Sequence, residues 1–386
     1  MDFRETAEQA MLREAVAKIA AAYGHDYYVA KARAGEKTTE LWRAVSEAGF
    51  VGINLPEEHG GGGMGISELA IVTEELAAQG CPLMLLMVSP AICGTLLARF
   101  GTDAQRERWL SPIASGEAKM VFAITEPDAG SNSHRLDTVA TRDGGEGWRL
   151  SGRKYYISGV DEADAVLVVT RTGVEEGSGR GRLSLFIVDT DAPGLERTPI
   201  ELHVNAPERQ FFLFLDDVPV SGDRLLGDEG DGLRQVFHGL NPERIIGAAA
   251  GNGIARYALA KAAAYAGQRQ VWGVPIGAHQ GLAHPLAEAK IEVELARLMT
   301  QKAAWATDAG VPGAGEAANM AKYAAAEAAL RAVDVAIQVH GGNGFAAEYG
   351  VADLWWMARV LRTAPVSREM ILNYVAEHSL RLPRSY

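Results

Sequence analysis

A Glu-Arg pair stands in the segment GLNPERIIG, residues 239–247, ahead of a long stretch rich in Ala and Gly. Asn241 is a favourable N-cap, and Pro242 suits the first position of a helix, where no backbone N–H is needed. Glu243 would then lie in the first turn, where its negative charge complements the helix dipole. The alternative is that Glu243 is a general base directed into a pocket. These residues alone leave both interpretations open.

The segment AITEPDAGSNS, residues 123–133, runs from an expected strand into a polar turn. Thr125 offers a backbone N–H and a hydroxyl group to a planar acceptor. Gly130 and Ser131 let a ligand approach the backbone closely. A strand followed by an ordinary polar turn explains the same residues.

The segment KYYISG, residues 154–159, combines aromatic rings with a hydroxyl group. Because side chains alternate between the two faces of a strand, Tyr156 and Ser158 are expected on the same face. A ring that covers a flavin and a hydroxyl group at the flavin edge would suit this pattern. A cross-strand packing pair is the alternative.

Two further segments join long helical runs. In AYAGQRQVWGVPIGAHQ, residues 264–280, Arg269 stands at a corner between two expected helices. It can bind a pyrophosphate there, or cap the end of the first helix. In QVHGGNGFAAEY, residues 338–349, Gly341 and Gly342 end a helix. They are either a C-cap or a place where a cofactor passes close to the backbone.

The chain divides into three parts by its periodicity. Residues 1–119 have apolar side chains at helical spacing, residues 120–232 contain short β-rich runs, and residues 233–386 return to long helical runs. We therefore expect a mainly α protein with an N-terminal helical domain, a small antiparallel β-barrel or β-sandwich domain, and a C-terminal four-helix bundle. The first bundle helix is predicted over residues 242–266, about 37 Å long at ~1.5 Å per residue.

The composition excludes several classes of protein. The chain has 386 residues, of which 48% are hydrophobic, and a formal net charge of -12. Such a surface repels nucleic acid phosphates and anionic lipid, so neither is expected as a partner. Cys81 and Cys93 form no C-x-x-C motif, and no metal site is expected. The N-terminal residues lack the apolar run of a signal peptide or membrane span, so we expect a cytoplasmic protein.

The order and spacing of TEPDAGS, KYYISG, R-x-x-W-G-x-P-I with Gln280, and QVHGGNGF closely resemble the acyl-CoA dehydrogenase family of flavoproteins. The resemblance covers essentially the whole chain. It implies a role in fatty acid metabolism and FAD bound between the β domain and the bundle. It also implies an oligomer, usually a tetramer, whose subunits share the cofactor sites. In the family reaction a carboxylate removes the α proton of an acyl-CoA while the β hydrogen leaves as hydride to flavin N5.

The resemblance also implies which residues hold the cofactor. Tyr156 and Ser158 stand where the family usually has Trp and Thr, so the ring and the hydroxyl group are kept. One set reaches the FAD of a neighbouring subunit: Arg269, Trp272, Gln280, Gln338, Gly341 and Gly342. The other implied cofactor-binding residues are Phe122, Ile124, Thr125, Gly130, Ser131, Tyr156, Ser158 and Ser367.

The position of the base differs between branches of the family. Many members carry it in a Tyr-Glu-Gly-Thr stretch near the C-terminus. Counted in register from Gln338, that position falls on Pro365, which cannot accept a proton, and Glu369 is a poor substitute by position. Isovaleryl-CoA and long-chain acyl-CoA dehydrogenases place the base in a Glu-Arg pair at the start of the long bundle helix. Glu243 and Arg244 match that pair, so the resemblance favours Glu243 as the base.

The substrate is less well defined by the sequence. Met84, Met87 and Val88 either line the acyl pocket or belong to the core. With Ser131 and Arg244 they are the candidate substrate-binding residues. Because no G-x-G-x-x-G motif follows a strand, electrons are expected to leave through an electron-transferring flavoprotein rather than NAD. The alternatives are a flavin oxidase or monooxygenase on the same fold, a dehydrogenase that acts on a carrier-protein thioester, and one half of a hetero-oligomer.

Overall fold

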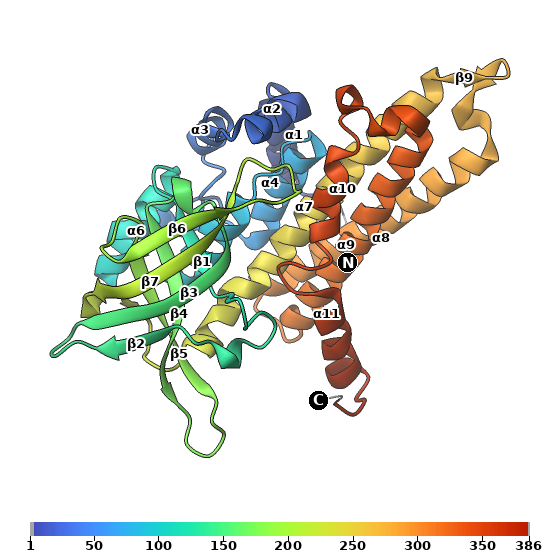
Figure 1. Ribbon diagram of the computed structural model, residues 1–386. Helices are drawn as coiled ribbons and strands as arrows, with labels where there is room; N and C mark the ends of the chain where they lie inside the picture. The colour runs from blue at the N-terminus through green and yellow to red at the C-terminus, as the bar shows by residue number, and fades with distance from the viewer. Residues whose placement is uncertain (1–3, 385–386) are drawn as a thin grey trace.

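The computed structural model describes residues 4–384 (Figure 1), so residues 1–3 and 385–386 of the predicted first and last domains lie outside the described residues. The N-terminal part is helical. Thr6 and Thr102 each accept a hydrogen bond from a backbone N–H of the helix that follows, which fixes where α1 and α6 begin. The helices are α1 (Ala7–Ala21), α2 (Gly24–Ala34), α3 (Thr39–Glu47), α4 (Ile66–Ala78), α5 (Thr95–Phe100) and α6 (Asp103–Ser115), with a π-helical segment, η2 (Met87–Gly94), before α5.

The middle part is one twisted sheet, in the order β6-β7-β3-β2-β4-β5-β8, with β1 paired to β4. Most pairs are antiparallel, as predicted, but β1 runs parallel to β4, and β2 has one parallel pairing with β4. The strands are β1 (Met120–Ala123), β2 (Val139–Arg142), β3 (Trp148–Ser158), β4 (Ala165–Val174), β5 (Gly181–Asp189), β6 (Leu195–Ile200), β7 (Gln210–Val220) and β8 (Leu225–Leu226).

The C-terminal part is built on long helices that lie side by side (Figure 1). A small hairpin of β9 (Gln270–Val271) and β10 (Val274–Pro275) connects the first two and projects from the end of the bundle farthest from the sheet. The helices are α7 (Gly232–Gln268), α8 (Gln280–Asp308), α9 (Ala314–His340), α10 (Asp353–Val360) and α11 (Arg368–Tyr374). The predicted fold class is therefore confirmed, while the exact domain boundaries stay a prediction.

The predicted start of the first bundle helix, α7, is wrong. The helix begins at Gly232 rather than Pro242, and Pro242 lies inside it. A proline inside a helix removes one backbone hydrogen bond, but tertiary packing outweighs this cost. Val236 is fully buried, and a Cβ placed on Gly239 would lie 3.0 Å from a methyl group of Ile92, so the preceding turns are held in the core. Glu243 therefore stands about three turns into the helix, beyond the reach of its dipole.

Helices α7 and α9 run parallel and in register. A Cβ on Gly315 would lie 3.3 Å from the side chain of Asn241, and a Cβ on Gly251 would lie 3.4 Å from the carbonyl oxygen of Ala325. The same interval of sequence separates the two contact points on each helix. Small residues at these points allow the backbones to approach closely. Residues of α9 can thus be placed against those of α7 by this register.

Candidate active site

Glu243 lies on α7 and is half-buried. Its side chain keeps some contact with solvent, but protein surrounds the carboxylate. Burial raises the pKa of Glu243 to about 7, although the nearby Arg244 and Lys322 charges lower it. The buried Cys93 thiol lies close enough for the Glu243 charge to contribute, after burial itself, to a raised thiol pKa. A carboxylate with this pKa is suited to accept a proton near neutral pH.

Arg244 is held by its own helix. Its Nη1 atom donates to Oδ1 of Asn241 at 2.9 Å, so Asn241 orients the arginine rather than capping the helix. The guanidinium group lies 5.7 Å from the ring centre of Phe237, a cation–π distance. Burial lowers the pKa of Arg244, while the Glu243 charge raises it. Arg244 is therefore a partly desolvated cation next to the candidate base.

Pro365, the position of the alternative base, lies beside the same face of α7. A Cβ on Gly247 would lie 3.6 Å from Cδ of Pro365 and 3.5 Å from Sδ of Met87. Gly247 follows Glu243 by one helical turn, so both residues lie on the same face of α7. Glu369, by contrast, has a side chain that is 72% exposed and lies 3.7 Å from Arg368. The structure thus brings Glu243, Met87 and Pro365 together, whereas the Glu369 side chain is mostly exposed.

Ile124 and Thr125 are fixed to strand β3 by a buried ion pair. Nζ of Lys154 donates to the carbonyl oxygen of Ile124 at 3.1 Å and to Glu126 at 2.8 Å. The backbone N–H of Tyr155 donates to the carbonyl oxygen of Thr125 at 2.8 Å. Two of the predicted cofactor-binding segments are therefore adjacent. Phe122 precedes them in β1 and is buried.

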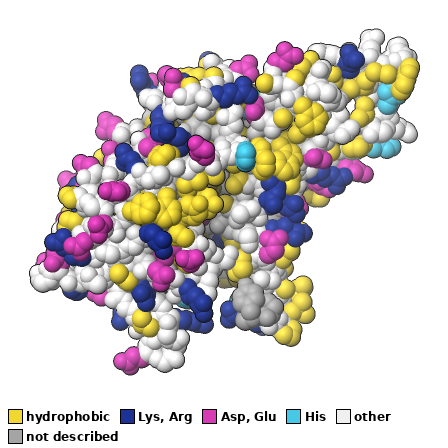
Figure 2. All heavy atoms as spheres, in the orientation of Figure 1, with side chains coloured by type: hydrophobic (Ala, Val, Ile, Leu, Met, Phe, Trp, Pro, Cys, Tyr) yellow, Lys and Arg dark blue, Asp and Glu magenta, His cyan; other side chains and the backbone are white. Residues whose placement is uncertain are grey.

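Tyr156 adopts a conformation that simple strand alternation did not predict. Its φ is 59°, in the left-handed region that few residues other than glycine adopt. The pairing of β3 with β7 shifts between Lys154 and Ile157, which marks a β-bulge. The bulge turns the Tyr156 side chain outward, where it is 51% exposed. Figure 2 shows hydrophobic side chains gathered over β3 and β7, where Phe214 is exposed as well.

Ser158 belongs to a chain of polar contacts that reaches the N-terminal part. Its hydroxyl group donates to Oε1 of Gln210 at 3.0 Å, and Nε2 of Gln210 lies 3.7 Å from Sδ of Met84. The backbone N–H of Met84 donates to Glu208 at 3.0 Å, a carboxyl group whose pKa burial raises to about 7. Met84 therefore lies near Ser158, Met87 lies near α7, and Val88 is buried.

Three further predicted cofactor-binding residues lie at the surface or in a turn. Gly130 and Ser131 are exposed, and a Cβ on Gly130 would meet no atom within 4 Å. Ser367 is the N-cap of α11, since its hydroxyl oxygen accepts a hydrogen bond from the backbone N–H of Met370 at 3.3 Å. Its hydroxyl hydrogen can still be donated to a ligand.

A second group of predicted residues lies at the far end of the bundle. Arg269 ends α7 about 39 Å from Glu243 along the helix axis, at ~1.5 Å per residue. Stacked rings of Tyr265 and His340, 4.4 Å apart, join α7 and α9 at this end. Trp272, on the β9–β10 hairpin, is 88% exposed. The whole group is exposed: Arg269, Trp272, Gln280, Gln338, Gly341 and Gly342.

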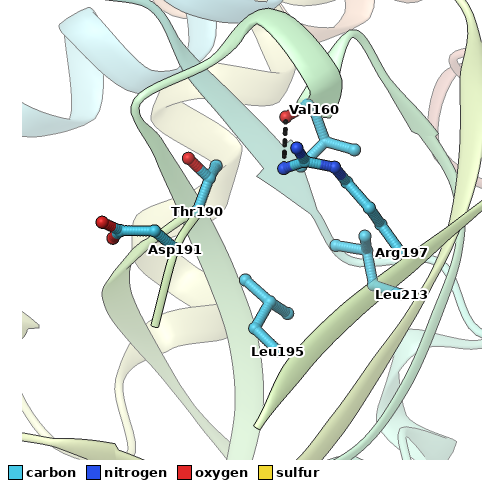
Figure 3. A pocket seen from close by; sticks show the side chains of 6 residues that line it. All are labelled: Val160, Thr190, Asp191, Leu195, Arg197 and Leu213. Atoms are coloured by element: carbon cyan, nitrogen blue, oxygen red, sulfur yellow. Dashed lines mark hydrogen bonds between the residues drawn. The ribbon is translucent and has the colours of Figure 1, made fainter. Parts of the chain in front are cut away.

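A pocket in the sheet contains none of these residues. Figure 3 shows it between β6, β7 and the end of β5. Its volume is about 280 Å³. Arg197 points across it toward the carbonyl oxygen of Val160, 3.5 Å away. The other lining residues are Thr190, Asp191, Leu195 and Leu213. None of its lining residues is a predicted catalytic, cofactor-binding or substrate-binding residue.

Two structural features bear on the predicted absences. Within residues 4–384, no group of three or more His, Cys, Asp or Glu side chains is arranged to hold a metal ion. Over the same residues, every helix is too short or too polar to cross a membrane.

Sequence comparisons agree with this architecture. Three family models match: the acyl-CoA dehydrogenase N-terminal domain over residues 6–117, the middle domain over 121–213 and the C-terminal domain over 230–380. An acyl-CoA dehydrogenase of Mycobacterium tuberculosis, FadE12, is 58% identical over 385 residues, which cover 100% of this chain and 99% of that protein.

Structural comparisons give the same result. A glutaryl-coenzyme A dehydrogenase solved with glutaryl-CoA has a TM-score of 0.94 at 32% identity, covering 100% of this chain and 98% of the other. A chain in the structure of an electron transferring flavoprotein of Acidaminococcus fermentans has a TM-score of 0.92 at 29% identity, covering 99% and 100%.

The α–β–α fold, together with the three matching domain models, defines a class of oxidoreductases. The chain belongs to the acyl-CoA dehydrogenase family and is an enzyme of that family.

The sequence did not single out two buried lysines, Lys154 and Lys322, that contact the site segments. Lys322 is 2% exposed and its Nζ atom donates to the carbonyl oxygen of Val366, next to Pro365. One signal was available in the sequence. Lys322 interrupts an alanine-rich helical face that includes Ala318 and Ala325, and a lone charge on a buried face indicates a paired group.

Proposed function

We propose that the protein catalyses FAD-dependent α,β-dehydrogenation of an acyl-CoA to a trans-2-enoyl-CoA, with Glu243 as the base that removes the α proton. The observation that carries this proposal is the environment of Glu243. Burial raises its pKa to about 7, and two cations, Arg244 and Lys322, oppose that rise. A structural carboxylate would be expected to form a close ion pair instead.

Glu243 would act in three steps. Bound substrate displaces the water that reaches the carboxylate, which strengthens the electrostatic interactions around it. The carboxylate then accepts the α proton and becomes neutral, as its raised pKa favours. The buried Arg244 offers positive charge to the negative charge that develops on the thioester oxygen. FAD, when bound, supplies the acceptor for the β hydride.

The residues around Tyr156 fit a flavin. An outward-facing ring on a bulge, two backbone segments fixed by Lys154, and the Ser158 hydroxyl group form a surface for a planar group with polar edges. Gly130, Gly341 and Gly342 leave open space next to the backbone, where a phosphate or sugar can approach. Phe122, Ile124, Thr125 and Ser131 would complete the near side of the site.

The distance between the two groups of residues supports an oligomer, which we propose is a tetramer. Arg269 lies about 39 Å along α7 from Glu243, at ~1.5 Å per residue. The residues near Glu243 and those near Arg269 in one chain therefore cannot both contact the same cofactor. Helix α8 also carries an exposed apolar stripe at helical spacing, namely Ile291, Leu295, Leu298 and Trp305. An apolar stripe of this length on a helix indicates a contact with another chain.

For the electron acceptor we propose an electron-transferring flavoprotein. The described part of the chain has a sheet without the β-α-β units of a dinucleotide-binding fold, which does not favour NAD. The exposed aromatic surface at Tyr156 and Phe214 leaves the flavin side of the sheet accessible to a partner.

An anaerobic screen tests the proposal. The purified protein is mixed with acyl-CoA thioesters of graded length and branching, and flavin bleaching is recorded. Bleaching by at least one thioester, with re-oxidation by an electron-transferring flavoprotein faster than by air, is the expected result. Rapid re-oxidation by air with release of H2O2 would indicate an oxidase. Bleaching only by a carrier-protein thioester would change the substrate class.

A further inference from the structure

Lys322 is a buried cation that the proposed reaction does not yet use. It lies on α9 and is 2% exposed, in a buried helical face made mostly of alanines, with Asn319 one turn away. An unpaired ammonium group in such a place costs several kcal/mol. Its partners must therefore come from neighbouring elements, and these partners identify what the lysine does.

One partner is the segment that carries Pro365. We call residues 362–368 the strap. Nζ of Lys322 donates to the carbonyl oxygen of Val366 at the middle of the strap. Both ends of the strap bind Glu327 of α9, because Nε of Arg362 lies 2.9 Å and Nε of Arg368 lies 3.0 Å from Oε1 of Glu327. The strap is thus fixed to α9 at its middle and at both ends.

Glu243 is the second group that lies near Lys322. In the parallel register of α7 and α9, Lys322 stands level with the residues just after Gly247. A long helical side chain leans toward the N-terminus of its helix, which brings the Lys322 ammonium group back toward the level of Glu243. The carboxylate is close enough to raise the pKa of Lys322, which burial lowers to about 8. The lysine thus lies between the strap and the base.

We propose that Lys322 is a positioning residue of the reaction: its buried ammonium group anchors the strap beside α7 and keeps the Glu243 carboxylate in the ionised form that accepts a proton. The proposal rests on the proposed function, since it assigns Lys322 a role toward the same base. The strap lies against α7 at Pro365, and the ammonium charge stabilises the Glu243 carboxylate anion.

Several other charged groups face this pair. Arg244 lies next to Glu243 on α7, and the Cys93 thiol faces it from η2. Arg244, Glu327 and Glu369 face Lys322, and the two carboxylates favour its charged form. Arg244 acts on Glu243 in the same direction as Lys322, so loss of Lys322 alone is expected to shift the titration of Glu243 without abolishing it.

Two variants separate the charge of Lys322 from its hydrogen bond. Lys322→Met removes both, whereas Lys322→Gln removes the charge but keeps an N–H donor for the carbonyl oxygen of Val366. The measurement is the pH dependence of anaerobic flavin reduction by the best thioester of the screen. Both variants are expected to move the midpoint to higher pH by about one unit, the effect of losing a nearby opposite charge. Below the midpoint this is a roughly tenfold slower reduction.

A readout without turnover accompanies the kinetics. The infrared band of the protonated Glu243 carboxyl group, identified by its absence in Glu243→Gln, should persist to the same higher pH in both variants. Lys18→Gln, which removes an exposed lysine from α1, is the matched control and should leave both midpoints unchanged. A wild-type midpoint in both Lys322 variants would overturn the proposal. A wild-type midpoint in Lys322→Gln alone would reduce Lys322 to a hydrogen-bonding anchor and also overturn the role of its charge.

If neither Lys322 variant folds, Glu243→Gln is used instead to measure the effect of the Glu243 charge on Lys322. The Lys322 pKa is about 8 in the folded protein against an ordinary 10.5, so the free energy of unfolding rises with pH between these values. Loss of the Glu243 charge lowers the Lys322 pKa further and moves the start of that rise to lower pH. If the free energy of unfolding of Glu243→Gln begins to rise at the same pH as that of the wild type, the proposal is overturned. If the wild-type flavin is bleached by no thioester, the proposed function fails instead, and the infrared and stability measurements still report on Lys322.

Discussion

The backbone of Gly247 lies against Pro365: a methyl group placed on Gly247 would be 3.6 Å from the Cδ atom of the proline and 3.5 Å from Sδ of Met87. Glu243 precedes Gly247 by one turn on the same face of α7. Pro365, the position at which the resemblance places the base of many family members, and Glu243 therefore lie beside the same face of α7. We expect a carboxylate from either backbone segment to reach the same place.

The first prediction concerns this contact. Gly247→Ala places its methyl group at ordinary van der Waals distance from Met87 and Pro365, so flavin reduction should stay within a few-fold of wild type. Gly247→Val adds two further methyl groups that must displace one neighbour, which typically costs about 1–3 kcal/mol. We expect its KM for the thioester to rise at least tenfold with FAD content unchanged. Steady-state kinetics and flavin absorbance measure both quantities, and equal KM values for the two variants would refute a thioester site beside Met87 and Pro365.

The second prediction concerns the Lys154–Glu126 pair, in which the lysine side chain is fully buried and the glutamate is 5% exposed. Burial raises the pKa of Glu126, but the Lys154 ammonium group and hydrogen bonds from Lys154, Thr138 and Asp137 outweigh it, so the net pKa lies below the usual value. Lys154→Met leaves the carboxylate without its cation and should reduce the free energy of unfolding by about 3–5 kcal/mol.

Lys154→Met should also lower FAD occupancy, because Lys154 holds the Ile124 carbonyl group in place. Since the folded-state pKa of Glu126 is depressed, its contribution to stability is present above pH ~4.5 and is lost as the pH falls below that value. In Lys154→Met, the decrease in the free energy of unfolding at acidic pH should be smaller. Denaturant titrations at several pH values measure it, and an unchanged stability would show that the pair is not structural.

Much of the fold was accessible from the sequence, because helical periodicity in the outer parts and β-rich runs in the middle are local signals. The start of α7 was not. Asn241 and Pro242 have the local chemistry of a helix start, but burial of Val236 and the contact of Gly239 with Ile92 continue the helix through them. Long-range packing decided this boundary, and no local pattern reports such packing.

The candidate site was predictable only in part. The segments around Thr125 and Tyr156 were found by their residue types, but the bulge that turns Tyr156 outward depends on the register of β3 against β7. Lys322 escaped prediction because its partners, Val366 and Glu243, are far from it in sequence. Side chains paired across elements become visible only when the elements are assembled.

The third prediction is that cofactor binding and assembly are coupled through the far end of the bundle. Arg269→Ala should lower FAD occupancy and the fraction of tetramer together, because the exposed Arg269 is assigned to a neighbour's cofactor. Arg180→Ala, in the exposed β4–β5 loop, removes a surface arginine without either effect. Light scattering and flavin absorbance on the same samples measure both. An Arg269→Ala tetramer saturated with FAD would argue against a shared cofactor site.

The fourth prediction is the pH dependence of the reaction. Burial, the largest influence, raises the pKa of Glu243 to about 7, and the base must be ionised to accept a proton. The rate of flavin reduction at low substrate concentration should therefore rise with pH and reach half its maximum near pH 7. Stability has the opposite sign: a carboxyl group with a raised folded-state pKa contributes stability that is lost as the pH rises through about 7. A rate of flavin reduction that stays constant between about pH 5 and about pH 8 would exclude a base with this pKa.

The central claim is that Glu243 removes the α proton, and its most direct test is Glu243→Gln in a single-turnover experiment. Glutamine keeps the shape of the side chain but cannot accept the proton, and loss of a general base typically costs about 10²–10⁴ in rate. Glu369→Gln is the matched control, because that side chain is 72% exposed and pairs with Arg368. The Glu243 variant should fold, retain FAD and bind the enoyl thioester, yet its flavin should stay oxidised when substrate is added anaerobically, while the Glu369 variant bleaches normally. Bleaching of the Glu243→Gln flavin at near the wild-type rate would contradict the account.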